Sequence, residues 1–294
     1  MNILITGGTG FLGSALVKHW VRAGHKLTLL VRQESSLERL ALLLPDVQLI
    51  NVFVNQDMDE IVRGVAPDAI VHTACAYGRR HETALQLVDA NIRLGLSLLD
   101  ALLKQKTEHV AFINAGTSLQ PTVSGYALSK IQFSQWGETL SLQHPNQLQF
   151  VNIRLQHMYG PGDDVSKFPT QVLHACHRNQ AQLALTAGEQ RRDLIYIDDV
   201  VSAYDVLLNN KSKLLNFEEV DVGSGQALPI RHFVETIHEL TKSRTELLFG
   251  AIPYRANEAM YCQADIGRMN LLNWKPAYSL KQGILKTIEL EFKI

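Results

Sequence analysis

The stretch Asn2-Ile3-Leu4-Ile5-Thr6-Gly7-Gly8-Thr9-Gly10-Phe11-Leu12-Gly13 decides how this chain folds. Residues 2–5 form a short apolar run, which predicts a buried parallel strand. Residues 14–23 have the pattern of a helix, and Gly24 directly after them is a typical helix end. The stretch therefore predicts a strand, a glycine-rich turn and a helix in succession, which is the context that a dinucleotide-binding fingerprint requires.

Three glycines of this turn have distinct expected roles. Gly7 and Gly10 lack side chains, so a pyrophosphate can approach the backbone closely, and Gly13 lets the helix pack against the strand. The N-terminus of the helix adds unpaired N–H groups and the positive end of the helix dipole. A tight turn that is glycine-rich for purely structural reasons is the alternative at this point.

Length and composition narrow the class of protein. The 294 residues suffice for one large core or for a domain with a smaller lobe, and 46% hydrophobic with 19% charged residues is typical of a folded globular protein. The net charge of −1 and the lack of Lys/Arg runs give no reason to expect nucleic acid or a membrane surface as a partner. Three widely spaced cysteines predict no disulfide framework, and no apolar run reaches membrane-spanning length. We expect a cytoplasmic protein.

Strands and helices alternate along the first half of the chain. Further strands are expected at residues 26–31, 47–54, 69–73, 110–114 and 149–155, with long helices at 85–104 and 126–142. This alternation predicts an α/β fold with a doubly wound, Rossmann-type parallel sheet. It stops after Gly160, where helices are expected at 168–179, 229–241 and 279–292, with irregular structure between the last two. The predicted domains are a dinucleotide-binding domain over 1–158 plus about 194–215, and a smaller C-terminal substrate-binding lobe over 159–193 and 216–294.

The end of the second strand bears on the choice of cofactor. In dinucleotide-binding folds, a carboxylate there binds the 2′-hydroxyl of NAD, whereas an arginine favours the 2′-phosphate of NADP. This strand ends in Val31-Arg32, and the first carboxylate after it is Glu34. We therefore expect NADP(H) in preference to NAD(H). The alternative is that Arg32 is only a solvated residue at a strand end.

A tyrosine and a lysine follow the fifth strand. Tyr126 and Lys130 are four residues apart, so on a helix they share one face. A neighbouring ammonium stabilises a phenolate, and we expect Lys130 to lower the pKa of Tyr126 and make it usable in proton transfer. Thr117 and Ser118 lie in the preceding loop, just beyond the carboxyl end of a parallel strand, where such sheets bind ligands. Taken alone, the tyrosine and lysine would more simply be a surface pair.

Three other groups of residues invite a functional interpretation. His72 with Cys75, and His174 with Cys176 and His177, have spacings that hint at a metal, but a packed histidine and one amphipathic helix face explain them better, and we expect no metal. The adjacent pair Arg191-Arg192 suits a phosphate, since guanidinium groups bind phosphoryl oxygens in a bidentate fashion. A solvated charge pair is an equally good explanation of these arginines.

Together these motifs resemble the extended short-chain dehydrogenases/reductases that act on nucleotide sugars, in the family's order and over essentially the whole chain. The residues that carry the resemblance are Thr6 to Gly13, His72-Thr73-Ala74, Asn91 with Gly95, Tyr126 with Lys130, Arg154 with Tyr159-Gly160-Pro161, and Arg192-Asp193. Within the family, the chain is most similar to the CDP-abequose/CDP-paratose synthase type, through His157 to Asp164, Arg192 to Ile197, and Asp221 to Gly225.

The resemblance implies a role for individual residues. Tyr126 would protonate the C4 oxygen of the sugar, and Lys130 would hold the nicotinamide ribose. A hydroxyl should orient the substrate carbonyl; since Ala115 stands near its usual place, we expect Thr117, with Ser118 as the alternative. The implied cofactor contacts are Gly7, Thr9, Gly10, Phe11, Leu12, Gly13, Arg32, Thr73, Ala74, Asn91, Tyr126, Lys130 and Leu155. The implied substrate contacts are Ser118, His157 and Arg192.

The resemblance also implies an activity: NADPH-dependent reduction of the C4 keto group of a nucleotide-linked 4-keto-6-deoxyhexose, with a CDP-sugar favoured, in deoxysugar and O-antigen biosynthesis. It implies a homodimer formed through the helices at 85–104 and 126–142. One alternative is an NAD-dependent sugar-nucleotide 4-epimerase, against which Arg32 speaks. Another is a non-catalytic NADP-sensing regulator, which would need neither Tyr126 nor Lys130.

Overall fold

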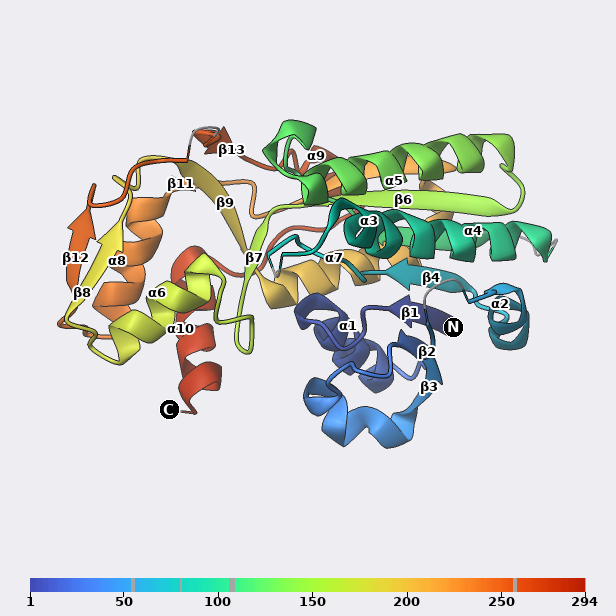
Figure 1. Ribbon diagram of the computed structural model, residues 1–294, viewed down its shortest axis with the longest axis horizontal. Helices are drawn as coiled ribbons and strands as arrows, with labels where there is room; N and C mark the ends of the chain where they lie inside the picture. The colour runs from blue at the N-terminus through green and yellow to red at the C-terminus, as the bar shows by residue number, and fades with distance from the viewer. Residues whose placement is uncertain (54–55, 80, 106–108, 256–257, 294) are drawn as a thin grey trace. The chain divides into compact units, whose positions relative to one another are not determined.

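The computed structural model describes residues 1–53, 56–79, 81–105, 109–255 and 258–293. The chain forms two compact units (Figure 1). The first contains Met1–Leu155 and Tyr204–Val220, and the second contains Gln156–Ala203 and Asp221–Ile294. None of the described helices is both long and apolar enough to cross a membrane.

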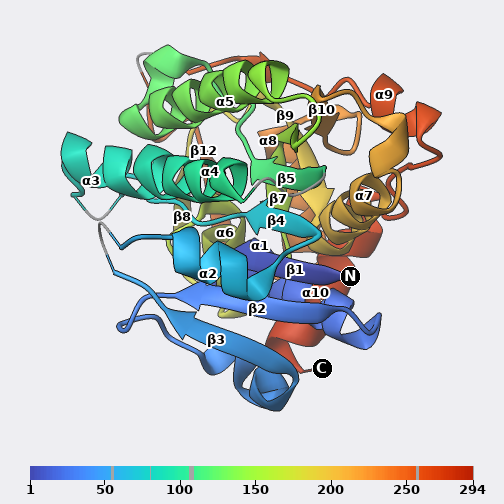
Figure 2. The same cartoon turned by 90° about the vertical axis from the view of Figure 1, so that its right-hand side faces the viewer.

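The first unit is built on a seven-stranded sheet with the order β10-β6-β5-β4-β1-β2-β3. Figure 2 shows β3, β2, β1, β4 and β5 following one another in this sheet. The pairs β1–β2, β2–β3, β1–β4, β4–β5 and β5–β6 are all parallel. The order reverses at β1, which has β2 on one side and β4 on the other, and ligands of such sheets bind at this reversal. The strands are β1 Asn2–Thr6, β2 Lys26–Val31, β3 Val47–Asn51, β4 Ala69–His72, β5 Val110–Ala115, β6 Leu148–Leu155 and β10 Phe217–Val222.

Helices connect these strands, as parallel pairing requires. They are α1 Phe11–Arg22, α2 Asp59–Val65, α3 Ala84–Val88, α4 Leu94–Lys104, α5 Gly125–Gln143 and, from Tyr204 onward, α7 Ile197–Asn209, with 3-10 turns at Glu38–Asp46, Pro121–Val123 and Lys211–Lys213. Alternate residues of the strands, such as Leu4, Ile70 and Phe112, pack with apolar side chains of α2, α4 and α5 in one buried core.

Three phenylalanines fill the centre of that core. Phe112 on β5 stacks on Phe150 of β6 with ring centroids 5.3 Å apart, and Phe133 of α5 meets both rings edge-on. A Cβ on Gly95 of α4 would lie 2.2 Å from the ring of Phe133, so glycine makes room for the aromatic side chain. The close packing of the helices on this face therefore depends on a residue without a side chain.

The second unit contains small sheets and four helices among its described residues. One sheet joins β7 His157–Tyr159, β9 Arg191–Tyr196, β11 Ala227–Pro229 and β13 Tyr261–Cys262, and the other pairs β8 Gln182–Leu185 with β12 Glu246–Phe249. The helices are α6 Phe168–His177, α8 Ile230–Leu240, α9 Gly267–Leu271 and α10 Leu280–Phe292.

The α/β class and the Rossmann-type parallel sheet predicted from the sequence are confirmed, and so is a smaller C-terminal part with sheets of its own. Three expectations on single elements need correction. The expected helix at 85–104 contains a π-helical turn at Asp89–Arg93, the expected strand at 47–54 ends at Asn51, and the region expected to be irregular contains β12, β13 and α9. Val54, the expected end of that strand, lies outside the described residues.

The contact of Gly95 with Phe133 gives a stability prediction. Gly95→Ala forces the Phe133 ring to move, and we expect a loss of about 1–3 kcal/mol in the free energy of unfolding, typical of an overpacked core. The matched control is Gly64→Ala in α2, where an added Cβ meets nothing within 4 Å. There alanine should stabilise by up to about 1 kcal/mol through its helix propensity. Urea unfolding of both variants checks this, and equal effects at the two sites would contradict it.

Candidate active site

The turn after β1 is a cradle that only glycine permits. Gly7 has a φ of +70°, and a Cβ on it would lie 2.5 Å from the backbone nitrogen of Ala74. A Cβ on Gly13 would lie 2.1 Å from the carbonyl oxygen of Gly7. The turn is closed by the N–H of Gly10, which donates to that same oxygen at 2.9 Å. The backbones of the turn, of α1 and of the segment after β4 thus meet without side chains between them.

The start of α1 fits a phosphate. Gly10 occupies the N-cap in an extended conformation, no side chain of the described residues caps the helix, and its first turn contains no acidic residue. The side chain of Leu12 is buried, so this residue can meet a ligand only through its backbone, while Thr9 and Phe11 are half-buried. These features suit the pyrophosphate of a dinucleotide, which the helix N-terminus attracts.

The end of β4 is fastened to the end of β1. Thr73 donates its hydroxyl to the carbonyl of Thr6 at 2.8 Å, and the N–H of Ala74 donates to the Thr6 hydroxyl at 3.3 Å. That hydroxyl also bonds Nδ1 of His72 at 2.8 Å. Burial, helped by the charge of Lys130, holds the pKa of His72 well below its usual range. His72 is therefore a neutral, packed side chain, as expected from its place in an apolar strand.

Asn91 supports the loop that follows β4. It is fully buried, its Oδ1 accepts from the N–H of Ala76 at 2.8 Å, and its Nδ2 donates to the carbonyl of Ala76 and to Ser129 Oγ, both at 2.9 Å. The side chain joins the loop to α5 and acts on the site through the position of that loop. Its place in a π-helical turn, where the helix bulges, brings it to this loop.

Tyr126 lies in the first turn of α5, whose N-cap Ser124 accepts a hydrogen bond from Ala127 N–H at 3.1 Å. Its ring lies 4.9 Å from that of Tyr77, and the Thr117 side chain is its neighbour in the loop after β5. Burial, followed by the proximity of Cys75, raises the pKa of Tyr126, and the neighbouring Thr117 side chain only partly opposes this. Our expectation that its pKa is lowered is therefore wrong for this structure, because desolvation of the phenolate dominates.

Lys130 lies one helical turn further along α5. It is 1% exposed, and its Nζ donates to Asn114 Oδ1 at 3.5 Å. Burial lowers the pKa of Lys130, and Cys75 opposes that shift. The surface-pair alternative for Tyr126 and Lys130 does not hold, since the lysine is inside the unit.

The structure distinguishes the two hydroxyls of the loop after β5. Thr117 contacts Tyr126, whereas Ser118 donates its hydroxyl to the carbonyl of Leu155 at 3.0 Å. Thr117 is thus the hydroxyl beside the phenol, and Ser118 and Leu155 join the ends of β5 and β6.

Arg32 directly follows β2, and its side chain is exposed. Its Nε lies 3.4 Å from Glu34 Oε1, and its backbone N–H donates to Ser35 Oγ at 3.2 Å. A guanidinium, a serine hydroxyl and a carboxylate are therefore close together at this strand end. The guanidinium of Arg32 and the hydroxyl of Ser35 can donate hydrogen bonds to a phosphate, whereas the negative charge of Glu34 repels one.

Arg192 and His157 lie in the second unit. Arg192 is buried on β9, and its guanidinium donates to the carbonyl of Arg191 at 2.9 Å and to the carboxylate of Glu258. Half-buried His157 starts β7 opposite Leu194 of β9. Glu258 was not foreseen, because it lies in a segment expected to be irregular and nothing in the sequence pairs it with Arg192.

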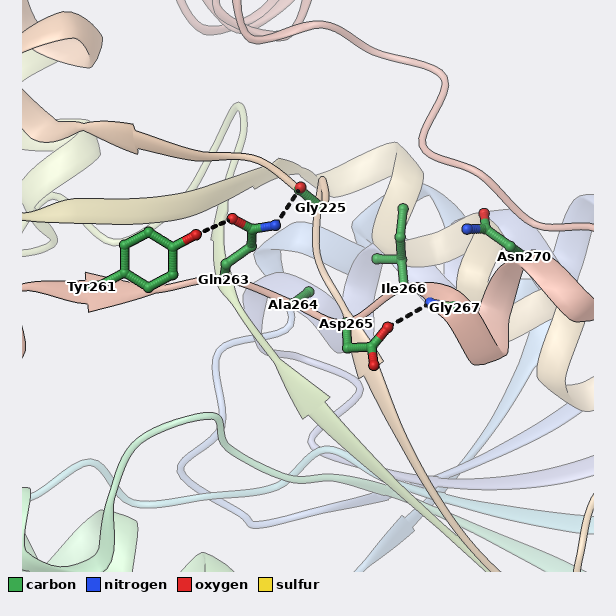
Figure 3. A pocket seen from close by; sticks show the side chains of 8 residues that line it. All are labelled: Gly225, Tyr261, Gln263, Ala264, Asp265, Ile266, Gly267 and Asn270. Atoms are coloured by element: carbon green, nitrogen blue, oxygen red, sulfur yellow. Dashed lines mark hydrogen bonds between the residues drawn. The ribbon is translucent and has the colours of Figure 1, made fainter.

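Asp193 shapes the turn after β10. Its carboxylate accepts hydrogen bonds from Ser224 N–H at 2.6 Å, Ser224 Oγ at 2.7 Å, Gly225 N–H at 2.9 Å and Ala264 N–H at 3.1 Å. A pocket of about 530 Å³ lies beside this turn (Figure 3). Gln263 in its wall accepts from Tyr261 and donates to the carbonyl of Gly225. No substrate residue predicted from the sequence is among its described lining residues.

Metal chemistry finds no support among the described residues, which contain no cluster of three His, Cys, Asp or Glu side chains able to hold an ion. His174 bonds Glu291 at 3.0 Å, and His177 stacks on Phe292 at 3.5 Å. These two histidines therefore contact α10, whereas Cys176 is fully buried and its carbonyl accepts from Ser243 Oγ at 2.8 Å.

The sequence matches one family model and several known proteins. Residues 3–223 match the model of the NAD dependent epimerase/dehydratase family. The chain is 28% identical to CDP-abequose synthase of Salmonella typhimurium, covering 96% of this chain and 95% of that protein. It is 23% identical to a putative UDP-glucose 4-epimerase of Methanocaldococcus jannaschii, with 97% of each chain covered.

Solved structures resemble the chain over its full length. UDP-glucose 4-epimerase of Thermotoga maritima has a TM-score of 0.85 at 22% identity, covering 100% of this chain and 99% of its own. Pal of Bacillus thuringiensis has a TM-score of 0.87 at 20% identity with the same coverage. At these identities the structures establish the fold, and the family match goes further. The chain belongs to the NAD dependent epimerase/dehydratase family, the extended short-chain dehydrogenases/reductases that its motifs predicted.

Proposed function

We propose that this chain is an NADPH-dependent reductase of the C4 keto group of a nucleotide-linked 4-keto-6-deoxyhexose, with a CDP-linked sugar favoured. The observation that carries the proposal is the contact of Thr117 with Tyr126 on a helix that also buries Lys130. The likeness to CDP-abequose synthase along 96% of the chain supports the choice of substrate class.

In the reductive direction Tyr126 would act as a proton donor. A phenol carries its proton at neutral pH and can donate it to the carbonyl oxygen of a substrate. An enzyme that begins by oxidising a hydroxysugar, such as an epimerase, needs the tyrosine as a base instead. Thr117 would orient the carbonyl through its hydroxyl, and Lys130 would bind the nicotinamide ribose.

The first unit would hold the cofactor, which supplies a hydride when bound. The glycine cradle would receive its pyrophosphate, and Arg32 with Ser35 its 2′-phosphate. Thr73 and Ala74 would line the cofactor through the backbone that Asn91 supports. The hydroxyl of Thr73 is already bonded to β1, so its contribution would be positional.

The second unit would hold the nucleotide diphosphate, with Arg192 and His157 as its contacts. Arg192 is suited to a phosphate by its fixed, buried guanidinium, but Glu258 competes for the same donor.

We also propose a homodimer. Helix α5 exposes the apolar side chains of Leu128, Trp136 and Leu142, and α3 exposes those of Leu85 and Val88. Exposed apolar side chains that gather on helices are typical of a protein–protein interface.

Replacement of the phenol tests the catalytic proposal. Tyr126→Phe removes only the proton donor, so we expect kcat to fall by about 10²- to 10⁴-fold while the Kd for NADPH stays near its wild-type value. The matched control is Tyr196→Phe in the second unit, since this buried hydroxyl has no hydrogen-bond partner among the described residues. Stopped-flow reduction and fluorescence titration give the two quantities. Full turnover by Tyr126→Phe would remove the tyrosine from the mechanism.

Replacement of Arg32 tests the cofactor proposal. Arg32→Ala loses a charge-assisted contact with a 2′-phosphate, so the Kd for NADPH should rise about 10- to 100-fold and that for NADH much less. Glu34→Gln is the matched control, because it removes the opposing charge and should tighten NADPH binding. Isothermal titration with both cofactors measures the effects. Equal losses for NADPH and NADH in Arg32→Ala would return Arg32 to the role of a solvated residue.

A further inference from the structure

A row of side-chain hydrogen bonds crosses the sheet of the first unit and starts at Lys130. Its Nζ donates to Asn114 Oδ1 at 3.5 Å, Asn114 Nδ2 donates to Asn152 Oδ1 at 2.8 Å, and Asn152 Nδ2 donates to Glu219 Oε2 at 2.8 Å. Lys130, Asn114 and Asn152 are all buried, whereas Glu219 is part-exposed. The row thus connects a buried ammonium to a carboxylate at the surface.

The register of the strands creates this row. Asn114 of β5 lies directly opposite Asn152 of β6, and Glu219 belongs to β10, the strand beyond β6. Asn114 is two residues after Phe112, so both side chains face the core under α5. A Cβ on Gly116 would lie 2.5 Å from Asn152 Oδ1. Because Gly116 has no side chain, there is room for the amide group of Asn152.

The two ends of the row fix the direction of every bond in it. An ammonium can only donate and a carboxylate can only accept. Asn114 must therefore turn its oxygen to Lys130 and its nitrogen to Asn152, and Asn152 must do the same toward Glu219. All amide dipoles point the same way, an arrangement in which each bond strengthens the next.

The surroundings of Lys130 oppose its charge. Burial of the ammonium favours its neutral form. Lys130 interacts electrostatically with His72 of β4, which is neutral, and with Cys75 after β4. Tyr126 lies one turn away on its own helix. At the far end, Arg154 lies 3.4 Å from Glu219 Oε1 and holds the carboxylate at the edge of the sheet.

We propose that Asn114, Asn152 and Glu219 form a positioning network that holds the Lys130 ammonium charged and directed within the site. Glu219 is then a positioning residue that acts on Lys130 through two amides. The functional consequence rests on the proposed role of Lys130 in binding the nicotinamide ribose. The electrostatic consequence does not, since it concerns the protonation of Lys130 in the protein alone.

Lysine ¹⁵N NMR of the full chain measures that protonation, with the Lys130 signal assigned by its loss in Lys130→Met. Glu219→Gln keeps the hydrogen bonding but removes the charge, so we expect the proton affinity of Lys130 to fall about tenfold, which is about one unit in its pKa. The matched control is Glu218→Gln. Glu218 is the neighbouring residue of β10, and its carboxylate accepts from Leu215 N–H at 3.0 Å instead of from Asn152, so the Lys130 signal should titrate as in the wild type.

A double variant tests the same network in the opposite direction. Asn152→Asp with Glu219→Gln moves the carboxylate one step closer to Lys130, and the pKa of Lys130 should return to at least its wild-type value. An unchanged pKa in Glu219→Gln, or a low one in the double variant, overturns the network. Because no substrate is used, this result is separate from the reductase assay, in which a wild type that consumes no NADPH would refute the proposed function alone.

Discussion

The close approach of three backbone segments is the constraint on which the first unit depends. The turn after β1, the start of α1 and the segment after β4 touch at Gly7, Gly13 and Ala74, where an added Cβ would come within 2.1–2.5 Å of backbone atoms. A side chain there would push β1 and β4 apart at the point where the strand order reverses. The same absence of side chains leaves room for a pyrophosphate at the helix N-terminus, so one packing requirement produces both the fold and the cradle.

Much of this could be predicted from the sequence, because the decisive signals are local. The strand, glycine turn and helix at 2–22 lie within one continuous stretch, and the spacing of Tyr126 and Lys130 defines a helix face by itself. Other features depend on distant partners. The four residues of β12 pair with β8 across more than 60 positions, and nothing local in the sequence marks β12 as a strand. The π-helical turn around Asn91 is explained by its bonds to Ala76 and Ser129, which no helical periodicity reveals.

Electrostatics was the harder part to predict. Helix spacing indicated that Tyr126 and Lys130 lie on one helix, as they do on α5, but the direction of the tyrosine pKa follows from burial, which the sequence does not state. Burial acts on the two groups in opposite senses, favouring a neutral phenol and a neutral amine. A neutral phenol suits proton donation, whereas a neutral lysine would lose its electrostatic role. The polar residues Asn114 and Asn152 interrupt apolar strands, and the sequence shows them. Their hydrogen bonds to each other and to Glu219 become apparent only from the register of the strands.

The central claim is that this site delivers hydride and a proton to a keto sugar that carries a nucleotide. The most direct measurement is the consumption of NADPH by the purified chain with CDP-, dTDP-, UDP- and GDP-linked 4-keto-6-deoxyhexoses, with NMR of the products. The account predicts that NADPH is consumed and that C4 becomes a hydroxyl, fastest with a CDP-linked sugar. A chain that retains NAD and interconverts hydroxysugars without consuming NADPH would contradict it.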